Sequence, residues 1–228
     1  AFPAQENNYQ MNENLIGDVY GRYMMTTKSN WNSKTFAVYK AASGWYDFPF
    51  NSTMTSVYTA WNEIRKLTNG EGINYAWAQI LRVAAMQRIT DMYGPIPYSK
   101  VSNGNLKVEY DSQEDAYKAM FTDLTAAINT LTTYVAANPD SKPMAQYDGI
   151  YQGDFKQWVK FANSLKLRMA LRIRYADPAL AKSMAEEAVN HIIGVMTANG
   201  DNTKYNYVKG NPITVMWDAY KDTRACAD

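Results

Sequence analysis

The sequence predicts an all-α protein in which helical hairpins stack on one another, with long irregular loops and minor strand content. Apolar residues recur at the spacing of one helix face through most of residues 52–194. One expected helix also carries apolar side chains on two opposite faces, as a helix does inside a layered array of helical pairs. No internal sequence repeat accompanies this pattern.

The first hairpin is expected from two helices joined by the turn "NGEG". The first helix spans about residues 52–68, and the second spans about residues 73–93. The apolar face of the first helix consists of Met54, Val57, Tyr58, Trp61 and Ile64. The second helix is rich in alanine, a strong helix former whose small side chain lets a neighbouring helix approach closely.

The second helix ends in an unusually stiff stretch, "ITDMYGPIPYSK". Gly94 suits the positive φ that closes a helix, and neither Pro95 nor Pro97 can continue one. The two prolines also hold Ile96 and Tyr98 extended. We expect these two side chains to pack on the body of the protein rather than to contact a ligand.

The clearest helical period lies in "SQEDAYKAMFTDLTAAINTLTTYV". Its apolar stripe consists of Tyr117, Met120, Phe121, Leu124, Ile128, Leu131 and Val135. Either Asp111 or Ser112 is expected to cap this helix, with Glu114 or Asp115 as the partner in a capping box.

A second hairpin is predicted over residues 154–194. Asp154 and Gln157 have the spacing of a capping box, and "DP" at residues 177–178 restarts a helix after a tight turn. The main apolar face of the first helix consists of Trp158, Phe161, Ala162, Leu165, Met169 and Ile173. Leu167 and Leu171 lie on the opposite side, so we expect this helix to be covered on two sides.

Two long segments show little helical period. One is "SNWNSKTFAVYKAASGWYDFPF", which follows a first helix expected at about residues 12–24, and the other is "AANPDSKPMAQYDGIYQGD". Loops of this length are uncommon in compact domains and are often functional. After Gly194 the helical pattern weakens into short strands and loops.

Composition narrows the function classes. The 228 residues, 46% of them hydrophobic, are enough for a domain with a large core. The 23 basic and 22 acidic residues nearly cancel, which argues against nucleic acid as a partner. The single cysteine, Cys226, allows neither an intrachain disulfide nor a thiolate metal cluster. The 18 Tyr and 6 Trp suit both a large core and a surface that stacks on sugars.

Classical signatures of catalysis are mostly absent, so we expect no cofactor and no metal, although paired carboxylates for glycoside hydrolysis stay possible. The sequence has no GxGxxG, P-loop or HExxH motif, and the single histidine, His191, is expected at the edge of the core. Asp91 is the first suspect for an acid–base role, but we expect it to bond a neighbouring group instead. Arg168, Arg172 and Arg174 are expected to pair with carboxylates or to lie along the surface.

Two blocks, "RITDMYGPIPYSK" at residues 88–100 and "WVKFANSLKLRMALRI" at residues 158–173, resemble the most recognisable blocks of the SusD/RagB family. The capped helix between them and "HIIGVMTANGDN" at residues 191–202 agree in order and spacing. The resemblance covers most of residues 52–202 and points to the SusD-like outer-membrane lipoproteins of Bacteroidetes.

The resemblance implies tetratricopeptide-like hairpins stacked in an α-α superhelix. It implies a protein that captures glycans or oligopeptides at the cell surface and passes them to a SusC-like TonB-dependent transporter without bond cleavage, so the resemblance implies no enzyme activity. Family members are considerably longer, so residues 1–228 are expected to form one helical domain that is truncated relative to the family. The lipid-bearing cysteine that would anchor the protein in the outer membrane is not in this chain.

The ligand-binding candidates come from side-chain chemistry, because sugar rings stack on aromatics while nearby amides and carboxylates take their hydroxyls. Trp31, between Asn30 and Asn32, has that make-up, and so do Trp45, Tyr46 and Asp47. The alternative is that these aromatics anchor the loop on the helices. Trp217, beside Asp218, is a weaker candidate, and Trp61, Trp77 and Trp158 are expected in the core.

Two other functions remain open from the residues alone. Abundant aromatics and acids also suit a glycoside hydrolase of the helical-toroid type, in which two carboxylates flank the substrate. Stacked helical pairs also suit a helical-repeat scaffold that binds a protein segment in its groove.

Overall fold

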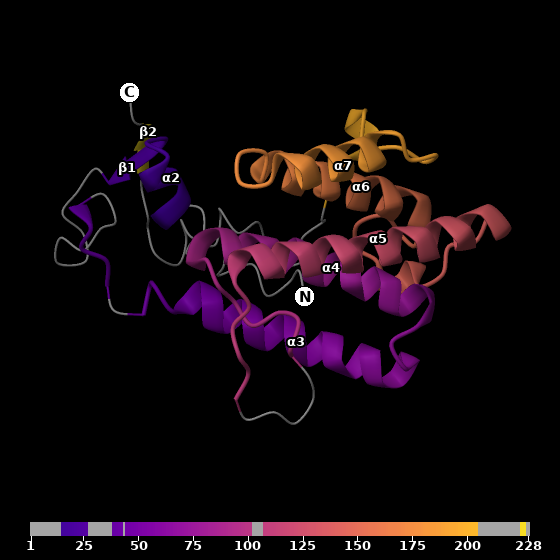
Figure 1. The fold of residues 1–228 in the computed structure, drawn as a ribbon, viewed down its shortest axis with the longest axis horizontal. Helices are drawn as coiled ribbons and strands as arrows, with labels where there is room; N and C mark the ends of the chain where they lie inside the picture. Colours follow the sequence, from indigo (N-terminus) through magenta and orange to yellow (C-terminus); the bar gives the residue numbers. More distant parts are fainter. Residues whose placement is uncertain (1–14, 27–37, 43, 102–106, 205–223, 227–228) are drawn as a thin grey trace. The chain divides into compact units, whose positions relative to one another are not determined.

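The computed structural model describes residues 15–26, 38–42, 44–101, 107–204 and 224–226. Within these residues, long α-helices dominate and one two-stranded sheet is present, so the all-α class is confirmed (Figure 1). Packing divides the chain into two compact units, residues 1–58 with 207–228 and residues 59–206. We call them the terminal unit and the helical unit and describe each by itself. That the chain forms one domain stays a prediction.

The terminal unit contains a short helix and the small sheet. α2 spans Asp18–Tyr20, and β1 (Met24–Thr26) pairs antiparallel with β2 (Arg224–Cys226). The helix expected at about residues 12–24 therefore ends early in the described part. The chain leaves it through Arg22, whose φ of 60° cannot continue a helix, and joins the sheet.

The first long hairpin is confirmed, with an earlier start than the sequence indicates. α3 spans Phe48–Thr68 and crosses the boundary between the two units, and α4 spans Gly72–Tyr93. α3 begins four residues early because Pro49 lies in its first turn, where a missing N–H costs nothing. At the far end the indole N–H of Trp61 donates to the Gln79 carbonyl oxygen at 2.6 Å, which joins the two helices.

Three further helices follow in the helical unit. α5 spans Gln113–Ala137, α6 spans Phe155–Arg172 and α7 spans Pro178–Val189. Each packs on the one before it, α5 on α4, α6 on α5 and α7 on α6 (Figure 1). The core of this unit is apolar, and its largest fully buried side chains include Trp158, Tyr98, Phe155, Ile80, Met86, Ile89, Ile96, Met120, Leu124 and Leu131.

The helix starts follow the predicted caps. Ser112, and not Asp111, caps α5, because its hydroxyl oxygen accepts the Asp115 N–H at 3.0 Å. The Asp177 carboxylate accepts the Leu180 N–H at 3.0 Å. The Asp154 carboxylate accepts the Gln157 N–H at 3.2 Å, but the side-chain oxygen of Gln157 is buried without a partner, so the reciprocal half of this capping box is not formed.

α6 is covered on two sides, but of the two leucines that predicted this Leu167 is only partly buried and Leu171 is exposed. Leu171 is 56% exposed, which contradicts the expectation for this side chain. The second contact is polar instead. The ammonium of Lys166, a residue only 1% exposed, donates to Thr125 of α5 at 2.8 Å and pairs with Glu187 of α7 at 2.6 Å. A buried lysine is tolerated here because both partners satisfy it.

The stiff exit from α4 packs as predicted. Gly94 has a φ of 77° and donates its N–H to the Thr90 carbonyl oxygen at 2.8 Å, and Ile96 and Tyr98 are fully buried. Ile96 pairs with Asp111 in an isolated antiparallel bridge. The sequence "PIPY" is therefore a structural element that fixes the path from α4 to α5.

Asp111 holds this exit loop instead of capping α5. Its carboxylate accepts the Tyr98 N–H at 3.0 Å, the Ser99 N–H at 2.6 Å and the Ser99 hydroxyl at 2.6 Å. Burial raises the pKa of Asp111, but the hydrogen bonds from Ser99 and Tyr98 more than offset this and hold the pKa below its usual range.

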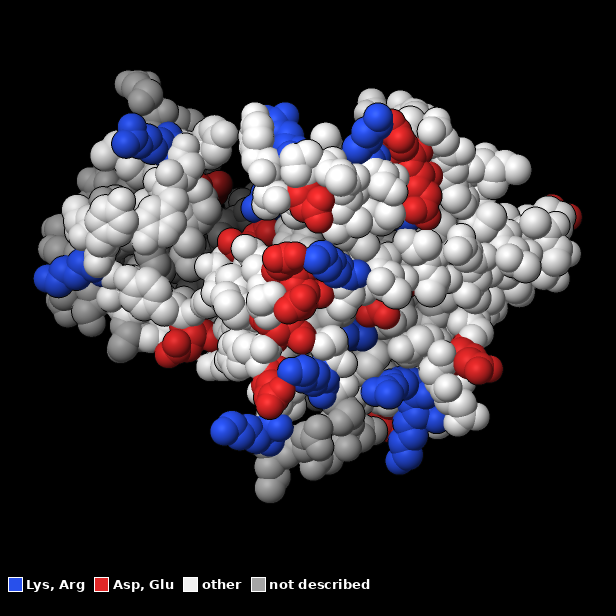
Figure 2. Space-filling view, in the orientation of Figure 1, with Lys and Arg blue, Asp and Glu red and all other residues white. Residues whose placement is uncertain are grey.

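No helix in the described part of the chain is both long enough and apolar enough to cross a membrane. On the face drawn in Figure 2, acidic and basic side chains lie interspersed, without a broad patch of one sign. This distribution agrees with the near-zero net charge, formally +1.

Candidate functional site

The predicted aromatic segment lies in the terminal unit, directly before α3. Trp45 is partly buried and packs against a small core formed by Leu15 and Val19. The turn into α3 is closed by the N–H of Phe48, which donates to the Gly44 carbonyl oxygen at 2.9 Å. Trp45 therefore has a packing contact within this segment, which is compatible with the alternative that the aromatics anchor the loop.

The other two candidates beside it are exposed. Tyr46 is 47% exposed, and Asp47 is exposed while its carbonyl oxygen accepts the Asn51 N–H at 2.9 Å. Trp31, with Asn30 and Asn32, and Trp217, with Asp218, lie outside the described residues. The ligand-binding role of Trp31, Trp45, Tyr46 and Asp47 stays a prediction.

The terminal unit adds two tyrosines that the sequence reasoning missed. The rings of Tyr20 and Tyr39 lie 5.8 Å apart between centroids, and the two residues are 47% and 80% exposed. Burial, followed by proximity to Tyr46 and Tyr39, raises the pKa of the Tyr20 hydroxyl. We call Tyr20, Tyr39 and Tyr46 the tyrosine platform. Tyr20 comes from α2 and the other two from the irregular segment, so only folding brings them together.

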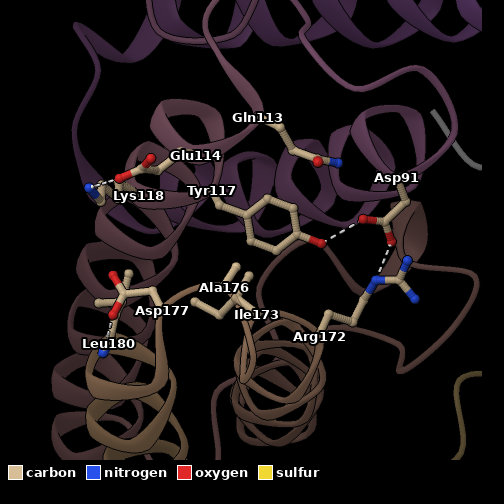
Figure 3. A pocket seen from close by; sticks show the side chains of 10 residues that line it. All are labelled: Asp91, Gln113, Glu114, Tyr117, Lys118, Arg172, Ile173, Ala176, Asp177 and Leu180. Carbon is tan, nitrogen blue, oxygen red and sulfur yellow. Dashed lines mark hydrogen bonds and ion pairs between the residues drawn. The ribbon is translucent and has the colours of Figure 1, made fainter.

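A second candidate is a pocket of about 360 Å³ in the helical unit. The ends of α4 and α6 and the starts of α5 and α7 surround it, and Figure 3 shows the ring of Tyr117 across its centre. The Tyr117 hydroxyl points to Asp91 on one side, and the Glu114–Lys118 pair lies on the other.

Asp91 is fully engaged in this pocket. Its carboxylate accepts the Tyr117 hydroxyl at 2.6 Å, pairs with the Arg172 guanidinium at 2.7 Å and accepts the Gln87 side-chain amide. Burial, and then the hydrogen bond to Asp91, raises the pKa of Tyr117 to about 12. Asp91 thus ties α4, α5 and α6 together, which confirms that it bonds its neighbours.

The other suspected groups also have structural partners. His191 is partly buried, and its ring nitrogens contact the Thr132 hydroxyl at 3.3 Å and the Ile193 N–H at 3.2 Å. Burial, followed by the charge of Lys166, lowers the pKa of His191. Arg174 lies over the ring of Tyr175 at 4.5 Å. In the described ranges, no three His, Cys, Asp or Glu side chains meet in a way that could hold a metal ion.

The predicted core tryptophans are mostly confirmed. Trp61 and Trp158 are 5% and 1% exposed, and Trp77 is partly buried with its ring 5.6 Å from that of Trp158. None of these three is therefore available to stack on a ligand in the way that the tyrosine platform is.

Helices that pack one on the next through the helical unit define an all-α protein built from helical hairpins. The family model described as the SusD-like "Susd and RagB outer membrane lipoprotein" matches residues 1–228. The chain belongs to this family, and the resemblance drawn from the two sequence blocks is confirmed.

Solved structures agree with this assignment. A SusD homologue from Bacteroides uniformis is 35% identical, with a TM-score of 0.86 over 98% of this chain and 47% of that one. A chitin-binding SusD homologue from Flavobacterium johnsoniae is 33% identical, with a TM-score of 0.83 over 97% of this chain and 48% of that one. A SusD-like protein from Bacteroides thetaiotaomicron is 30% identical, with a TM-score of 0.88 over 98% of this chain and 46% of that one.

The chain therefore spans about half the length of the solved relatives. No curated protein matches it.

Proposed function

We propose that the chain is part of a lipid-anchored protein of the outer membrane that captures glycans at the cell surface. The protein then passes them to a SusC-like TonB-dependent transporter, without cleaving them. Membership of a family of outer-membrane lipoproteins supports the location, and the tyrosine platform is the observation that supports a glycan.

The chemistry of the platform suits a sugar. Tyr39 and Tyr46 are 80% and 47% exposed, and a tyrosine ring can stack on the CH faces of a pyranose while its hydroxyl bonds the sugar hydroxyls. Asp47, next to Tyr46, adds an acceptor. Trp45 contributes by holding this segment on the small core formed by Leu15 and Val19.

Capture without cleavage is supported by the engagement of three buried or partly buried carboxylates. The Asp91 carboxylate bonds side chains of the neighbouring helices, and the Asp111 carboxylate accepts hydrogen bonds from the exit loop. Asp148 accepts the Trp158 indole N–H at 2.7 Å and the Gly153 N–H at 2.9 Å. A glycoside hydrolase needs one carboxyl group that stays free to protonate the leaving oxygen. None of these three has that freedom.

The test is a calorimetric titration of the full-length protein, and of this chain, with N-acetylchitohexaose, cellohexaose, maltohexaose and a mixture of hexapeptides. Chitohexaose is included because a relative is a chitin-binding SusD homologue. We expect saturable binding of one of the glycans and its recovery intact. Release of shorter sugars would contradict the proposal in favour of a hydrolase, and binding of the peptides alone would replace glycan by oligopeptide as the nutrient.

The platform is tested by Tyr46→Ala and Tyr39→Ala, with Tyr175→Ala as a matched control, since Tyr175 is 85% exposed in the helical unit. Loss of one stacked ring should weaken binding by about tenfold, which corresponds to about 1.4 kcal/mol. Equal affinity of all three variants would place the glycan elsewhere.

A further inference from the structure

The pocket beside Tyr117 continues into a second hollow. That hollow has a volume of about 620 Å³ and lies between α5 and α7, and it shares Lys118, Asp177 and Leu180 with the first. It extends to Asn129 on α5 and Glu187 on α7. α5 and α7 both pack on α6, so the two hollows together form a trough above it. We call this trough the α5–α7 groove.

The lining of the groove alternates apolar and polar groups. The apolar and aromatic lining residues include Ile173, Ala176, Leu180, Met184, Tyr117 and Phe121. The polar parts include Gln113, Thr122, Thr125 and Asn129 from α5. Such a mixture matches a sugar chain, whose rings offer CH faces and whose rims offer hydroxyls.

The charges along the groove are largely compensated within the protein. Arg172 pairs with Asp91 at 2.7 Å, Lys118 with Glu114 at 2.5 Å, and the buried Lys166 with Glu187 at 2.6 Å. A charged polymer would have to compete with these pairs. A neutral ligand can add hydrogen bonds to them without separating any pair, because each carboxylate and each Arg or Lys side chain has more than one bonding position.

The walls also favour a sugar over an extended peptide. A peptide bound as a strand needs unpaired backbone N–H and C=O groups beside it. In α5 and α7 the backbone N–H and C=O groups are paired within the helices, so a ligand in the groove would contact mainly side chains. The elongated outline, with two hollows in a row, suits several linked rings better than one.

We propose that the α5–α7 groove is a second glycan site, which binds a linear neutral oligosaccharide independently of the tyrosine platform. The choice of a glycan as the ligand rests on the proposed function. The location rests on the size, outline and lining of the two hollows. Lys118, Asp177 and Leu180 lie at the junction of the two hollows, where adjacent sugar rings would meet.

The test fills the groove and leaves the platform intact. Ala126 is exposed, lines the second hollow and lies on α5, so Ala126→Trp blocks the groove. Ala136→Trp is the matched control, because Ala136 is exposed on the same helix and does not line either hollow. Circular dichroism and thermal melting establish that both variants fold.

The readout is the stoichiometry and affinity of calorimetric titrations with the three hexasaccharides and the hexapeptide mixture named above. We expect two glycan sites in the wild type and in Ala136→Trp, and one site in Ala126→Trp. We also expect the single variant Tyr46→Ala to retain the groove site. The double variant Tyr46→Ala with Ala126→Trp should lose that site.

Each contrary result points to a different failure. A single site in the wild type that Ala126→Trp leaves unchanged overturns the groove and leaves the proposed function standing. Peptide binding that Ala126→Trp abolishes overturns the assignment of the groove to a sugar. The absence of any glycan binding to the full-length protein overturns both proposals.

Discussion

The two units use aromatic residues in opposite ways. In the helical unit, Trp158 is 1% exposed, and the rings of Tyr151 and Phe161 meet it at 5.1 and 5.5 Å. In the terminal unit, Tyr20 and Tyr39 meet at 5.8 Å but stay 47% and 80% exposed. Ring contacts alone therefore do not separate a buried core ring from an exposed one. An exposed ring that is already held by a neighbour can bind a ligand at little cost in entropy, which is the reason for proposing the tyrosine platform as a site.

The largest effect should come from removing the central ring of the helical unit. Trp158→Ala deletes a fully buried indole and removes one of the hydrogen-bond donors to Asp148, so the free energy of unfolding should fall by about 3–5 kcal/mol. Urea denaturation measures this loss. A loss below about 1 kcal/mol would remove the contrast with the exposed rings of the terminal unit.

The next prediction compares two glycines that have similar positive φ values, Gly153 in the loop before α6 and Gly94 at the end of α4. Gly153 has a φ of 80°, and an added Cβ would lie 2.6 Å from the Pro143 carbonyl oxygen, whereas Gly94, with a φ of 77°, has open space at that position. Both Gly→Ala variants strain the backbone, but only Gly153→Ala also clashes. We expect it to destabilise the helical unit by at least about 1 kcal/mol more than Gly94→Ala in urea titrations. Equal losses would show that backbone strain alone matters.

A third prediction concerns acid. Asp201 has a strongly lowered pKa, because the Lys160 ammonium bonds its carboxylate at 2.7 Å and the backbone N–H groups of Thr197 and Ala198 add to this effect. The unfolded chain then binds a proton more readily than the folded one. The stabilisation is complete above the unfolded pKa of about 3.9, begins to decrease as the pH falls below it, and is fully lost only below the lowered pKa of the folded state.

Urea midpoints at pH 7, 5, 4 and 3 measure this loss. Asp201→Asn should be less stable than the wild type at pH 7 and should approach it at pH 3. Asp140→Asn, at an exposed position, is the control and should follow the wild type throughout. A constant difference between Asp201→Asn and the wild type from pH 7 to pH 3 would contradict this role.

The smallest stability effect is expected in the terminal unit. Tyr46→Ala removes a half-exposed ring, so the free energy of unfolding should change by less than about 0.5 kcal/mol while glycan affinity falls. Thermal melting beside the titrations of Tyr46→Ala separates the two effects. A large loss of stability would make Tyr46 a structural residue, and the contrast between the units would disappear.

The sequence predicted the helices well because helix faces and caps are local. Ser112, Asp154 and Asp177 act within three residues of their own position, and Gly94 closes α4 by its own φ. α3 begins four residues before the expected start, and Pro49 fits there because the first turn of a helix tolerates a residue without an N–H.

The rest depends on contacts between distant segments. Leu171 and Lys166 lie in the same helix, yet the leucine is exposed and the lysine is buried. The partners of Lys166 are Thr125 and Glu187, which are 41 and 21 residues away in the sequence. Only the fold brings them together, so the helix pattern could not predict this burial. The pairing of Tyr20 with Tyr39 is of the same kind. Composition identified aromatics as candidates, but it could not group them.

The bridge between Ile96 and Asp111 also has a consequence for how this connection can vary in length. It fastens the two ends of the connection from α4 to α5, and Lys100 pairs with Glu109 at 2.5 Å just inside it. The entropy of closing a loop grows only slowly with its length, so residues added between Lys100 and Glu109 should cost little. This position is therefore the natural one for inserting a fluorescent tag or an epitope while the packing of α4 on α5 stays intact.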